Sequence, residues 1–419
     1  MQACSPDIHR FFVRLGTTTL AGETSSPDNT LRAYFATIHL WFPVIQEQIF
    51  RRRLSQLQHT PRAETALLFL TVSLIMTGET GINGGDDYQS QLYYLCRYLF
   101  SFLQSVRPPS LELVQVGLLL VLYELGSARF QAASLNIGTC ARLGYVLKLN
   151  TDPQEGQDYS SWAEAEERRR VWLGTYMLDC LINQVATDFQ APRAVDKPVS
   201  HFRLPVDDRE WEHFPEGPVQ CFFQPSFSTP LDTPLSYFAR EIQGVHILGQ
   251  VQALQNLADS DCLLREFGVL DNILIRFMEK LFEQTPGSWK TLCGANAIAL
   301  MAALSLHRIR VGFGNSNQGA MSYCSEAFHA KTMSILALSS IINMVWDICS
   351  KFNELQLGDK IRWVPLPAVI CAGETAITAV WLNRLDPGRS QLDYEPLRQT
   401  LSYATRTWDL AGKYLQRIG

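Results

Sequence analysis

Apolar segments of helical length, joined by short polar connections, constrain the fold of this chain more than any other feature. In residues 31–42 and 270–281 the apolar positions recur at spacings of three and four, as on one face of a helix. The segments of helical length cover residues 31–42, 63–77, 88–103, 111–125, 132–149, 235–258, 270–281, 295–311, 323–352, 367–384 and 392–417. No strand alternation and no alternating strand–helix pattern is visible. The sequence therefore predicts an all-α fold, a large multi-helix array of roughly a dozen helices.

A proline-rich segment interrupts the helical pattern at residues 190–234, which hold eight of the 20 prolines of the chain. Helix cannot run through that density of proline. A long irregular segment inside a compact protein is either a boundary or a functional lid or wrap. Its aromatic residues suggest that it packs against the helices. We expect a ligand or partner surface here, with Phe202, Trp211 and Phe214 as its candidate residues.

Composition excludes several classes of protein. The net charge of −5 argues against a broad surface that coats nucleic acid. The N-terminus has no apolar region of the kind that a signal peptide needs. The apolar runs at 66–76 and 114–122 are shorter than the roughly 20 residues of a membrane span. The longer run at 332–349 carries Asp347 and several serines and is interpreted as a buried core helix, so no membrane partner is expected.

The cysteines and histidines do not form a metal-binding pattern. The ten cysteines are scattered, and the closest pair is Cys349 and Cys371, with no Cys-x-x-Cys anywhere. This argues against a zinc site and against a disulfide framework, and favours separate buried thiols. His201, His213 and Cys221 share the proline-rich segment, but isolated loop histidines are usually exposed. No metal site is predicted.

Enzyme motifs are also missing. The sequence contains no His-Glu-x-x-His, no phosphate-binding P-loop and no Gly-x-Ser-x-Gly. An all-α enzyme with aspartate-bound metals would need a third acid after Asp86-Asp87 or Asp207-Asp208, and neither pair has one at the required position. No catalytic residue is predicted, although an all-α enzyme is kept as a third alternative.

The stretch EAEERRRVWLGTYMLD, residues 164–179, combines three acids, three arginines and an apolar end. Ser161 has the spacing of a helix cap before Glu164. Glu164 to Arg168 and Glu166 to Arg170 are i,i+4 pairs in the favourable order. A catalytic site would need a nucleophile or base with a partner, and a phosphate contact would be offset by the nearby acids. A structural helix with an aromatic–aspartate face is therefore the favoured interpretation.

Three stretches together resemble a known family. Residues 31–50 (LRAYFATIHLWFPVIQEQIF), 132–150 (AASLNIGTCARLGYVLKLN) and 164–179 are similar, in order, to the fungal-specific regulatory domain of binuclear zinc-cluster transcription factors, the middle homology region. The resemblance implies structural signature positions that are not catalytic. These are Glu166, Arg169, Arg170, Trp172 and Asp179.

This chain departs from the family pattern at several places. The usual second tryptophan is Leu173, the basic residue after the aspartate is Cys180, and a Gly-Arg-Pro is not recognisable in 187–195. Family members also carry a six-cysteine zinc cluster before this domain, whereas Cys4 stands alone ahead of Cys96. We therefore expect no zinc-cluster DNA reader in this chain, and zinc only if an upstream six-cysteine region exists.

The resemblance also implies a domain organisation. Residues 1–28 would be a tail or linker remnant and 29–189 the regulatory core. Residues 190–234 would be the proline-rich segment, and 235–419 the C-terminal helical half of the same domain.

The implied function is a nuclear transcriptional regulator of a metabolic or secondary-metabolite gene set. Its expected partners are the transcription machinery or a DNA-binding protein, a small-molecule effector and a second copy in a homodimer, with DNA contacted only indirectly. Arg51, Arg52 and Arg53 are a candidate nuclear-import patch, although a basic run at a helix end is more often solvated surface. The alternative is a metabolite- or partner-binding helical protein that no longer binds DNA.

Overall fold

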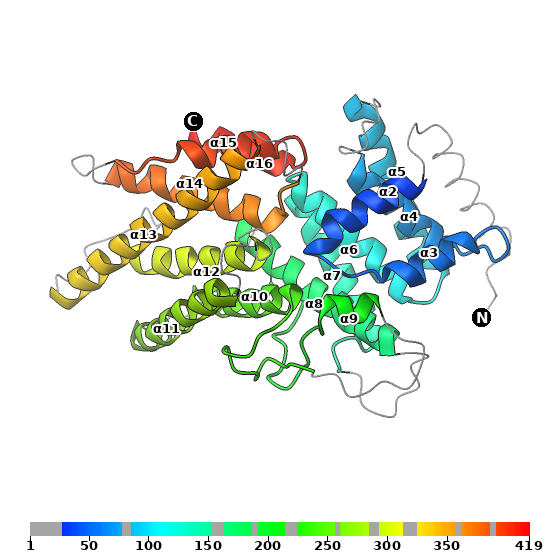
Figure 1. Ribbon diagram of the computed structural model, residues 1–419, viewed down its shortest axis with the longest axis horizontal. Coiled ribbons are helices and arrows are strands. Elements are labelled where there is room, and N and C mark those ends of the chain that lie inside the picture. The colour runs from blue at the N-terminus through cyan, green and yellow to red at the C-terminus, as the bar shows by residue number, and fades with distance from the viewer. Residues whose placement is uncertain are drawn as a thin grey trace. The chain divides into compact units, whose positions relative to one another are not determined.

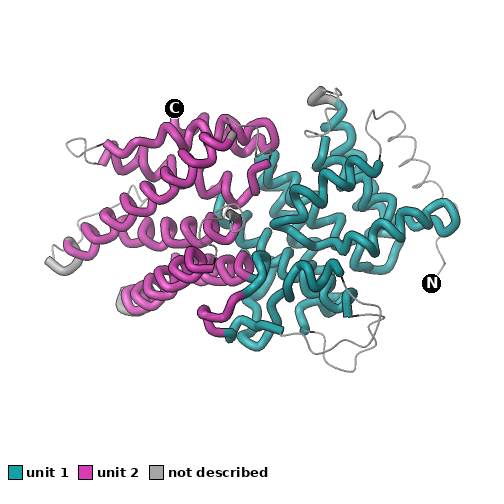
Figure 2. Tube along the Cα trace, viewed as in Figure 1, with its two compact units in different colours: residues 1–229, 235–239 teal, residues 230–234, 240–419 magenta. Residues whose placement is uncertain are grey.

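The computed structural model confirms the all-α prediction. It describes residues 27–77, 85–152, 162–186, 192–213, 224–255, 260–284, 293–312, 325–356, 363–385 and 391–419. Within these ranges every regular element is a helix, and the nearest approach to a strand is an isolated bridge between Arg203 and Ser226. The chain divides into two compact units, of which unit 1 comprises residues 1–229 and 235–239 and unit 2 residues 230–234 and 240–419 (Figure 2).

Unit 1 is built around α6, a helix that is apolar on nearly every side. Its elements are α2 (Pro27–Ala36), η1 (Ile38–Leu40), α3 (Glu47–Ser55), α4 (Ala63–Met76), α5 (Gly85–Val106), α6 (Leu111–Gly126), α7 (Phe130–Val146), α8 (Trp162–Val185) and α9 (Asp208–Glu212) (Figure 1). Ser110 caps the start of α6 by accepting a hydrogen bond from the Leu113 backbone N–H. A helix that is apolar all round needs neighbours on all sides, and α6 contacts α4, α5, α7 and α8.

Unit 2 is organised around α12 and α14. Its helices are the greater part of α10 (Tyr237–Leu254), α11 (Ser260–Gln284), α12 (Cys293–Val311), α13 (Ser325–Gln356), α14 (Leu366–Leu385), α15 (Glu395–Ala404) and α16 (Asp409–Ile418) (Figure 1). A buried polar network joins three of them. Arg308 of α12 donates to Thr378 (2.8 Å) and pairs with Glu374 of α14, and the Tyr414 hydroxyl of α16 donates to Glu374 (3.0 Å).

Two predicted helices differ from the structure at their ends. Residues 392–417 form α15 and α16 instead of one helix, because residues 405–408 leave the helix and the Trp408 indole donates to the Val364 carbonyl (2.8 Å). Residues 31–42 form the end of α2 and then η1, which stops before Pro43. The short helix α9 occupies residues inside the proline-rich segment, between Pro205 and Pro215.

The helix predicted at 332–349 lies within α13, and it is buried on one face instead of on all sides. Leu338 and Ile342 are fully buried, whereas Met333 and Leu336 are about half exposed. Among the described helices, α13 and α14 have the length and composition of a membrane span, and 33% and 72% of their most apolar stretches are buried inside the protein. Core helices of folded proteins share this length and composition, and α14 is largely buried in unit 2.

Candidate functional site

The helix α8 carries the sequence signature, and its charged residues point into unit 1 instead of into solvent. It packs against α6 and α7. All five signature residues are at most 2% exposed. They are Glu166, Arg169, Arg170, Trp172 and Asp179. Because a buried charge is costly without a partner, the partners of these residues define what α8 does.

Glu166 and Arg170 hold the start of α9 and the residues before it. The Glu166 carboxylate accepts hydrogen bonds from Arg170 Nε (2.8 Å) and from the Val206 backbone N–H (3.0 Å). Arg170 also donates to the Val206 carbonyl (2.9 Å) and to Asp208 (2.6 Å). Burial alone would lower the pKa of Arg170, but the carboxylates of Asp208 and Glu166 outweigh it and raise that pKa. Arg170 therefore stays charged, and together with Glu166 it fixes a segment almost 40 residues further along the chain.

Trp211 of α9 is the apolar counterpart of this ionic anchor. Its ring is fully buried, with the Arg170 guanidinium 4.1 Å from the ring centroid and the His39 imidazole stacked at 6.1 Å. The indole N–H donates to the Ala163 carbonyl (3.3 Å). Next to it, Glu212 lies 3.4 Å from His39 Nε2, and this contact lowers the pKa of Glu212. Cation–π and stacking contacts together hold α9 in place.

Arg169 reaches a different part of the proline-rich segment. Its guanidinium pairs with Glu166 and with Asp152 (3.2 Å). Asp152 in turn accepts from both the side chain and the backbone N–H of Arg203. The neighbouring Phe202 is 2% exposed. Arg169 therefore connects α8, the end of the turn after α7 and residue 203 in one chain of ion pairs.

Asp179 holds the beginning of the proline-rich segment. Its carboxylate accepts from Arg193 Nε (2.9 Å) and from the backbone N–H groups of Ala194 (3.2 Å) and Val195 (3.3 Å). Burial raises the pKa of Asp179, although Arg193 and the two N–H groups oppose it. Arg193 also donates to the Cys180 sulfur. Arg193, which the sequence interpretation did not single out, thus lies against the signature aspartate.

Trp172 of α8 packs against Tyr145 and Gly144 of α7. Its ring meets Tyr145 edge to face, with centroids 5.1 Å apart. A Cβ on Gly144 would lie 2.7 Å from the Trp172 ring, so α7 can come this close only because residue 144 is glycine. This contact couples two of the three stretches that resemble the family.

Glu167 belongs to the same group of buried charges, and the sequence interpretation missed it. Its carboxylate accepts from the Gln46 backbone N–H (3.0 Å) and from the Gln115 amide (2.9 Å), which places the turn after Pro43 against α8. Burial raises the pKa of Glu167. A signal was present, because the residue four positions later is Val171, not a cation, which puts Glu167 on the apolar side of the helix.

The structure describes two of the three candidate ligand or partner residues, Phe202 and Trp211. The Phe202 and Trp211 side chains are buried, so they anchor the proline-rich segment on α8 and do not face solvent. Phe214 and Cys221 lie outside the described residues, while His201 and His213 are exposed. A surface in this region would have to use exposed residues of the segment that these rings hold in place.

The candidate nuclear-import patch lies on α3, and its three arginines are not equivalent. Arg51 pairs with Asp28 (2.8 Å) and Glu47 (2.7 Å), and Arg53 pairs with the buried Glu112 (3.1 Å). Arg52 is exposed. Two of the three charges are thus neutralised inside unit 1.

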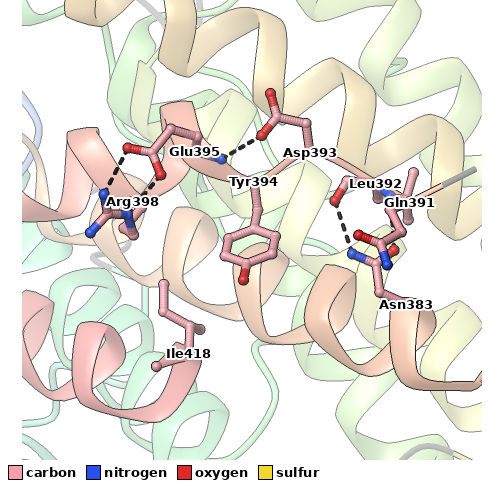
Figure 3. A pocket seen from close by; sticks show the side chains of 9 residues that line it. Asn383, Gln391, Leu392, Asp393, Tyr394, Glu395, Arg398 and Ile418 are labelled. Carbon is pink, nitrogen blue, oxygen red and sulfur yellow. Dashed lines mark hydrogen bonds and ion pairs between the residues drawn. The ribbon is translucent and has the colours of Figure 1, made fainter. Parts of the chain in front are cut away.

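A separate cavity of about 410 Å³ lies in unit 2 (Figure 3). It is lined by Asn383, Gln391, Leu392, Asp393, Tyr394, Glu395, Arg398, Ile418 and Gly419. Arg398 donates to both carboxylate oxygens of Glu395 (2.7 and 2.9 Å), and this hydrogen bonding lowers the pKa of Glu395. Asp393 accepts from the Glu395 backbone N–H (2.9 Å). These charged groups already neutralise or cap one another.

The side chains around α8 bind other segments of the same chain. Glu166, Glu167 and Asp179 are buried, and each accepts hydrogen bonds from a segment outside α8. Across the described ranges, no three histidine, cysteine, aspartate or glutamate side chains group in a way that could hold a metal ion. The buried charges of α8 are therefore explained by the segments that they hold within unit 1.

The family of this chain follows from its similarity to known proteins. The model of the fungal specific transcription factor domain matches residues 31–226, which contain all three similar stretches and α8. Transcription factor BOA15 of Botryotinia fuckeliana is 35% identical over 145 residues, or 34% of this chain and 79% of that protein. The chain belongs to the fungal-specific transcription factor domain family. The predicted resemblance is confirmed.

Other members of the family extend the match across more of the chain. Transcription factor tazR of Aspergillus terreus is 27% identical over 361 residues, covering 81% of this chain and 54% of the relative. Tropolone cluster transcription factor tropK of Talaromyces stipitatus is 26% identical over 259 residues, covering 56% of this chain and 43% of the relative. This chain thus spans about half the length of these two longer relatives. No solved structure matches it.

Proposed function

We propose that this chain regulates transcription of a secondary-metabolite gene set, with the two helical units as its regulatory body. The observation that carries the proposal is the similarity to tazR over 81% of the chain, together with the matched family domain. The tropolone relative is named for a gene cluster, and two further relatives are named as a pigment biosynthesis activator and an azaphilone cluster-specific factor. A non-enzymatic regulator is consistent with α8, whose buried charges have their partners within unit 1.

In this proposal α8 serves as the frame on which the regulatory surface is displayed. Its ion pairs hold residues 193–195 through Asp179, residue 203 through Arg169 and residues 206–208 through Arg170. A partner or effector that contacts the proline-rich segment would therefore act on a segment with a fixed position. Loss of one anchor should release that part of the segment and change regulation without touching DNA.

We further propose that DNA is recognised by something other than these helical units, either a partner or a zinc-cluster region. The sequence contains no Cys-x-x-Cys. Five cysteines of the described ranges are buried free thiols, namely Cys96, Cys140, Cys180, Cys349 and Cys371. Mixing the purified 419-residue chain with promoter DNA should give no sequence-specific shift below about micromolar concentration. A specific shift by this chain alone would contradict this part of the proposal.

The test of the regulatory role is removal of the gene from the fungus that encodes it, followed by transcript measurement. We expect coordinated loss of the transcripts of one group of neighbouring biosynthetic genes, and recovery when the wild-type gene is returned. The Arg170→Ala variant should fail to restore these transcripts. The matched control, Arg142→Ala at an exposed position, should restore them. Unchanged transcripts in the deletion strain would favour the alternative, a helical binding protein without a role in transcription.

Nuclear location is also part of the proposal, with Arg52 as the accessible residue of the α3 patch. A fluorescent fusion of the full chain should accumulate in nuclei. If the patch is the import signal, Arg52→Ala should move the fusion toward the cytoplasm while leaving the ion pairs of Arg51 and Arg53 intact. Unchanged accumulation would assign import to another segment or to a partner.

A further inference from the structure

The helix α11 in unit 2 has two adjacent apolar stripes, and only one of them is buried. The buried stripe is Phe267, Leu270, Leu274, Phe277 and Leu281, each at most 3% exposed. It faces α12, the main neighbour of α11. The sequence prediction of an apolar stripe in 270–281 corresponds to this face, although Ile273 and Met278 are only half buried. The rest of the helix is therefore free to have a different role.

The second stripe, called the outer stripe here, runs beside the first with the same spacing. It consists of Leu264, Gly268, Asp271, Ile275, Met278 and Phe282, at successive steps of four, three, four, three and four. Leu264 is 54% exposed, Ile275 46% and Phe282 47%. This is the repeat by which one helix packs along another. Three large apolar side chains half exposed on one line of a helix are typical of an interaction surface.

The charged member of the outer stripe, Asp271, has a side chain that is 34% exposed. Asp271 Oδ1 lies 3.4 Å from His307 Nε2 of α12, and the His307 ring also contacts Phe267 and Ser334. The carboxylate is thus drawn toward the body of unit 2. The positions on either side, Gly268 and Ile275, remain at the surface.

The outer stripe is symmetric about its own midpoint, near residue 273. Turning a second copy end over end places Leu264 against Phe282 of that copy and Gly268 against Met278. Gly268 has nothing within 4 Å of where a Cβ would stand, so it leaves room for the larger side chain opposite. A surface that matches itself after a half-turn is what a two-fold homodimer requires.

The charges beside the outer stripe select the same orientation. On its outward flank Arg265 lies near the start of α11, and Glu279 and Glu283 lie near its end. An antiparallel pair brings Arg265 of one copy near Glu283 of the other, whereas a parallel pair would place like charges together. Arg276, eleven residues or about three turns after Arg265, lies on the same side of α11 and is near Asp232.

We propose that the outer stripe of α11 is a homodimer interface in which two copies of this helix pack antiparallel. The inference does not depend on the proposed role in transcription. One helix per copy makes an interface at the small end of the usual range. We therefore expect a dissociation constant on the order of micromolar.

The first experiment is sedimentation equilibrium of the purified full chain between about 1 and 100 micromolar. Ile275→Arg and Phe282→Arg should each weaken dimerisation at least about tenfold, because each buries an unpaired charge in the apolar interface. Val269→Arg is the matched control, since Val269 is 50% exposed on the same helix but lies off the outer stripe. A chain that stays monomeric throughout, or a Val269→Arg variant that dissociates as much as the other two, would overturn the proposal.

A second measurement tests the orientation. Under mild oxidation, the double variant Leu264→Cys/Phe282→Cys should form a covalent dimer, whereas each single variant should behave like the wild-type chain. In the antiparallel pair, two copies of residue 264 stand about 27 Å apart, far beyond disulfide reach. A covalent dimer from the Leu264→Cys variant alone would indicate parallel helices and refute this interface.

Discussion

The helices α8 and α11 are nearly the same length, 24 and 25 residues, yet they break the usual rule of burial in opposite directions. In α8, charged side chains are buried, and each has a partner within unit 1. In α11, apolar side chains are exposed, and no described element covers them. The buried charges of α8 find their partners inside the chain, so they concern folding. The exposed apolar side chains of α11 are not covered by any described element, so they point to another molecule.

The comparison predicts its largest effect at Arg170. Arg170→Ala should lower the free energy of unfolding by about 3–5 kcal/mol, because it removes the buried guanidinium that pairs with Glu166 and Asp208 and donates to the Val206 carbonyl. Chemical denaturation of the purified chain measures this. The exposed Arg142→Ala on α7 is the control and should change the free energy by less than about 0.5 kcal/mol. Equal effects of the two variants would show that the α8 pairs do not stabilise unit 1.

A smaller effect is expected where α7 meets α8. Gly144→Ala should destabilise the protein by about 1–3 kcal/mol, since the new Cβ would stand 2.7 Å from the Trp172 ring. Gly138→Ala, six residues earlier on α7, has open space and should stabilise the helix by up to about 1 kcal/mol. Thermal denaturation of both variants gives the comparison. Two stabilised variants would mean that Trp172 can move away without cost.

The third prediction concerns pH. Burial raises the pKa of Glu167 in the folded protein above its ordinary value of 4.5. Between the unfolded and folded pKa values the native state holds more protons, so stability falls as the pH rises through that window and remains lower above it. Glu167→Gln keeps an oxygen that can accept from Gln46 and Gln115 but cannot ionise.

The stability of Glu167→Gln relative to the wild-type chain should therefore improve from about pH 4.5 upward. At neutral pH we expect the two proteins to differ by no more than about 1 kcal/mol, since the new amide N–H has no obvious acceptor. Urea unfolding at a series of pH values measures the difference. Parallel pH profiles would show that Glu167 does not titrate differently in the folded protein.

The smallest expected change in stability is on α11. At concentrations below the dissociation constant of the dimer, Ile275→Arg should alter the free energy of unfolding by less than about 0.5 kcal/mol, because residue 275 is 46% exposed. Its large effect should appear only in self-association. A variant that unfolds easily as a monomer would remove the contrast between α8 and α11.

Helix positions could be predicted because they depend on local patterns, and residues 63–77 and 111–125 match α4 and α6 to within one residue. The signature positions on α8 also followed from local order and from the family resemblance. The break between α15 and α16 could not, because it depends on a hydrogen bond from Trp408 to a carbonyl 44 residues away.

The partners of the site residues were beyond the sequence for the same reason. Glu167 accepts from a backbone group 121 residues earlier, and no local pattern specifies that distance. Trp211 was proposed for a ligand or partner surface because it is one of the aromatic residues of the irregular segment, and the sequence did not reveal that a buried arginine and histidine surround its ring. The side chains of an irregular segment can be buried when charged groups of a neighbouring helix hold that segment in place.

The distances that α8 spans also set an order of events during synthesis. Its partners extend from Gln46 to Asp208, so contacts that complete unit 1 are made between residues far apart in the chain. Such contacts slow folding. When the nascent chain has emerged only as far as α8, Arg170 and Asp179 still lack Asp208 and Arg193. Unit 1 can therefore complete these contacts only after the proline-rich segment has left the ribosome, and until then Arg170 and Asp179 lack these partners.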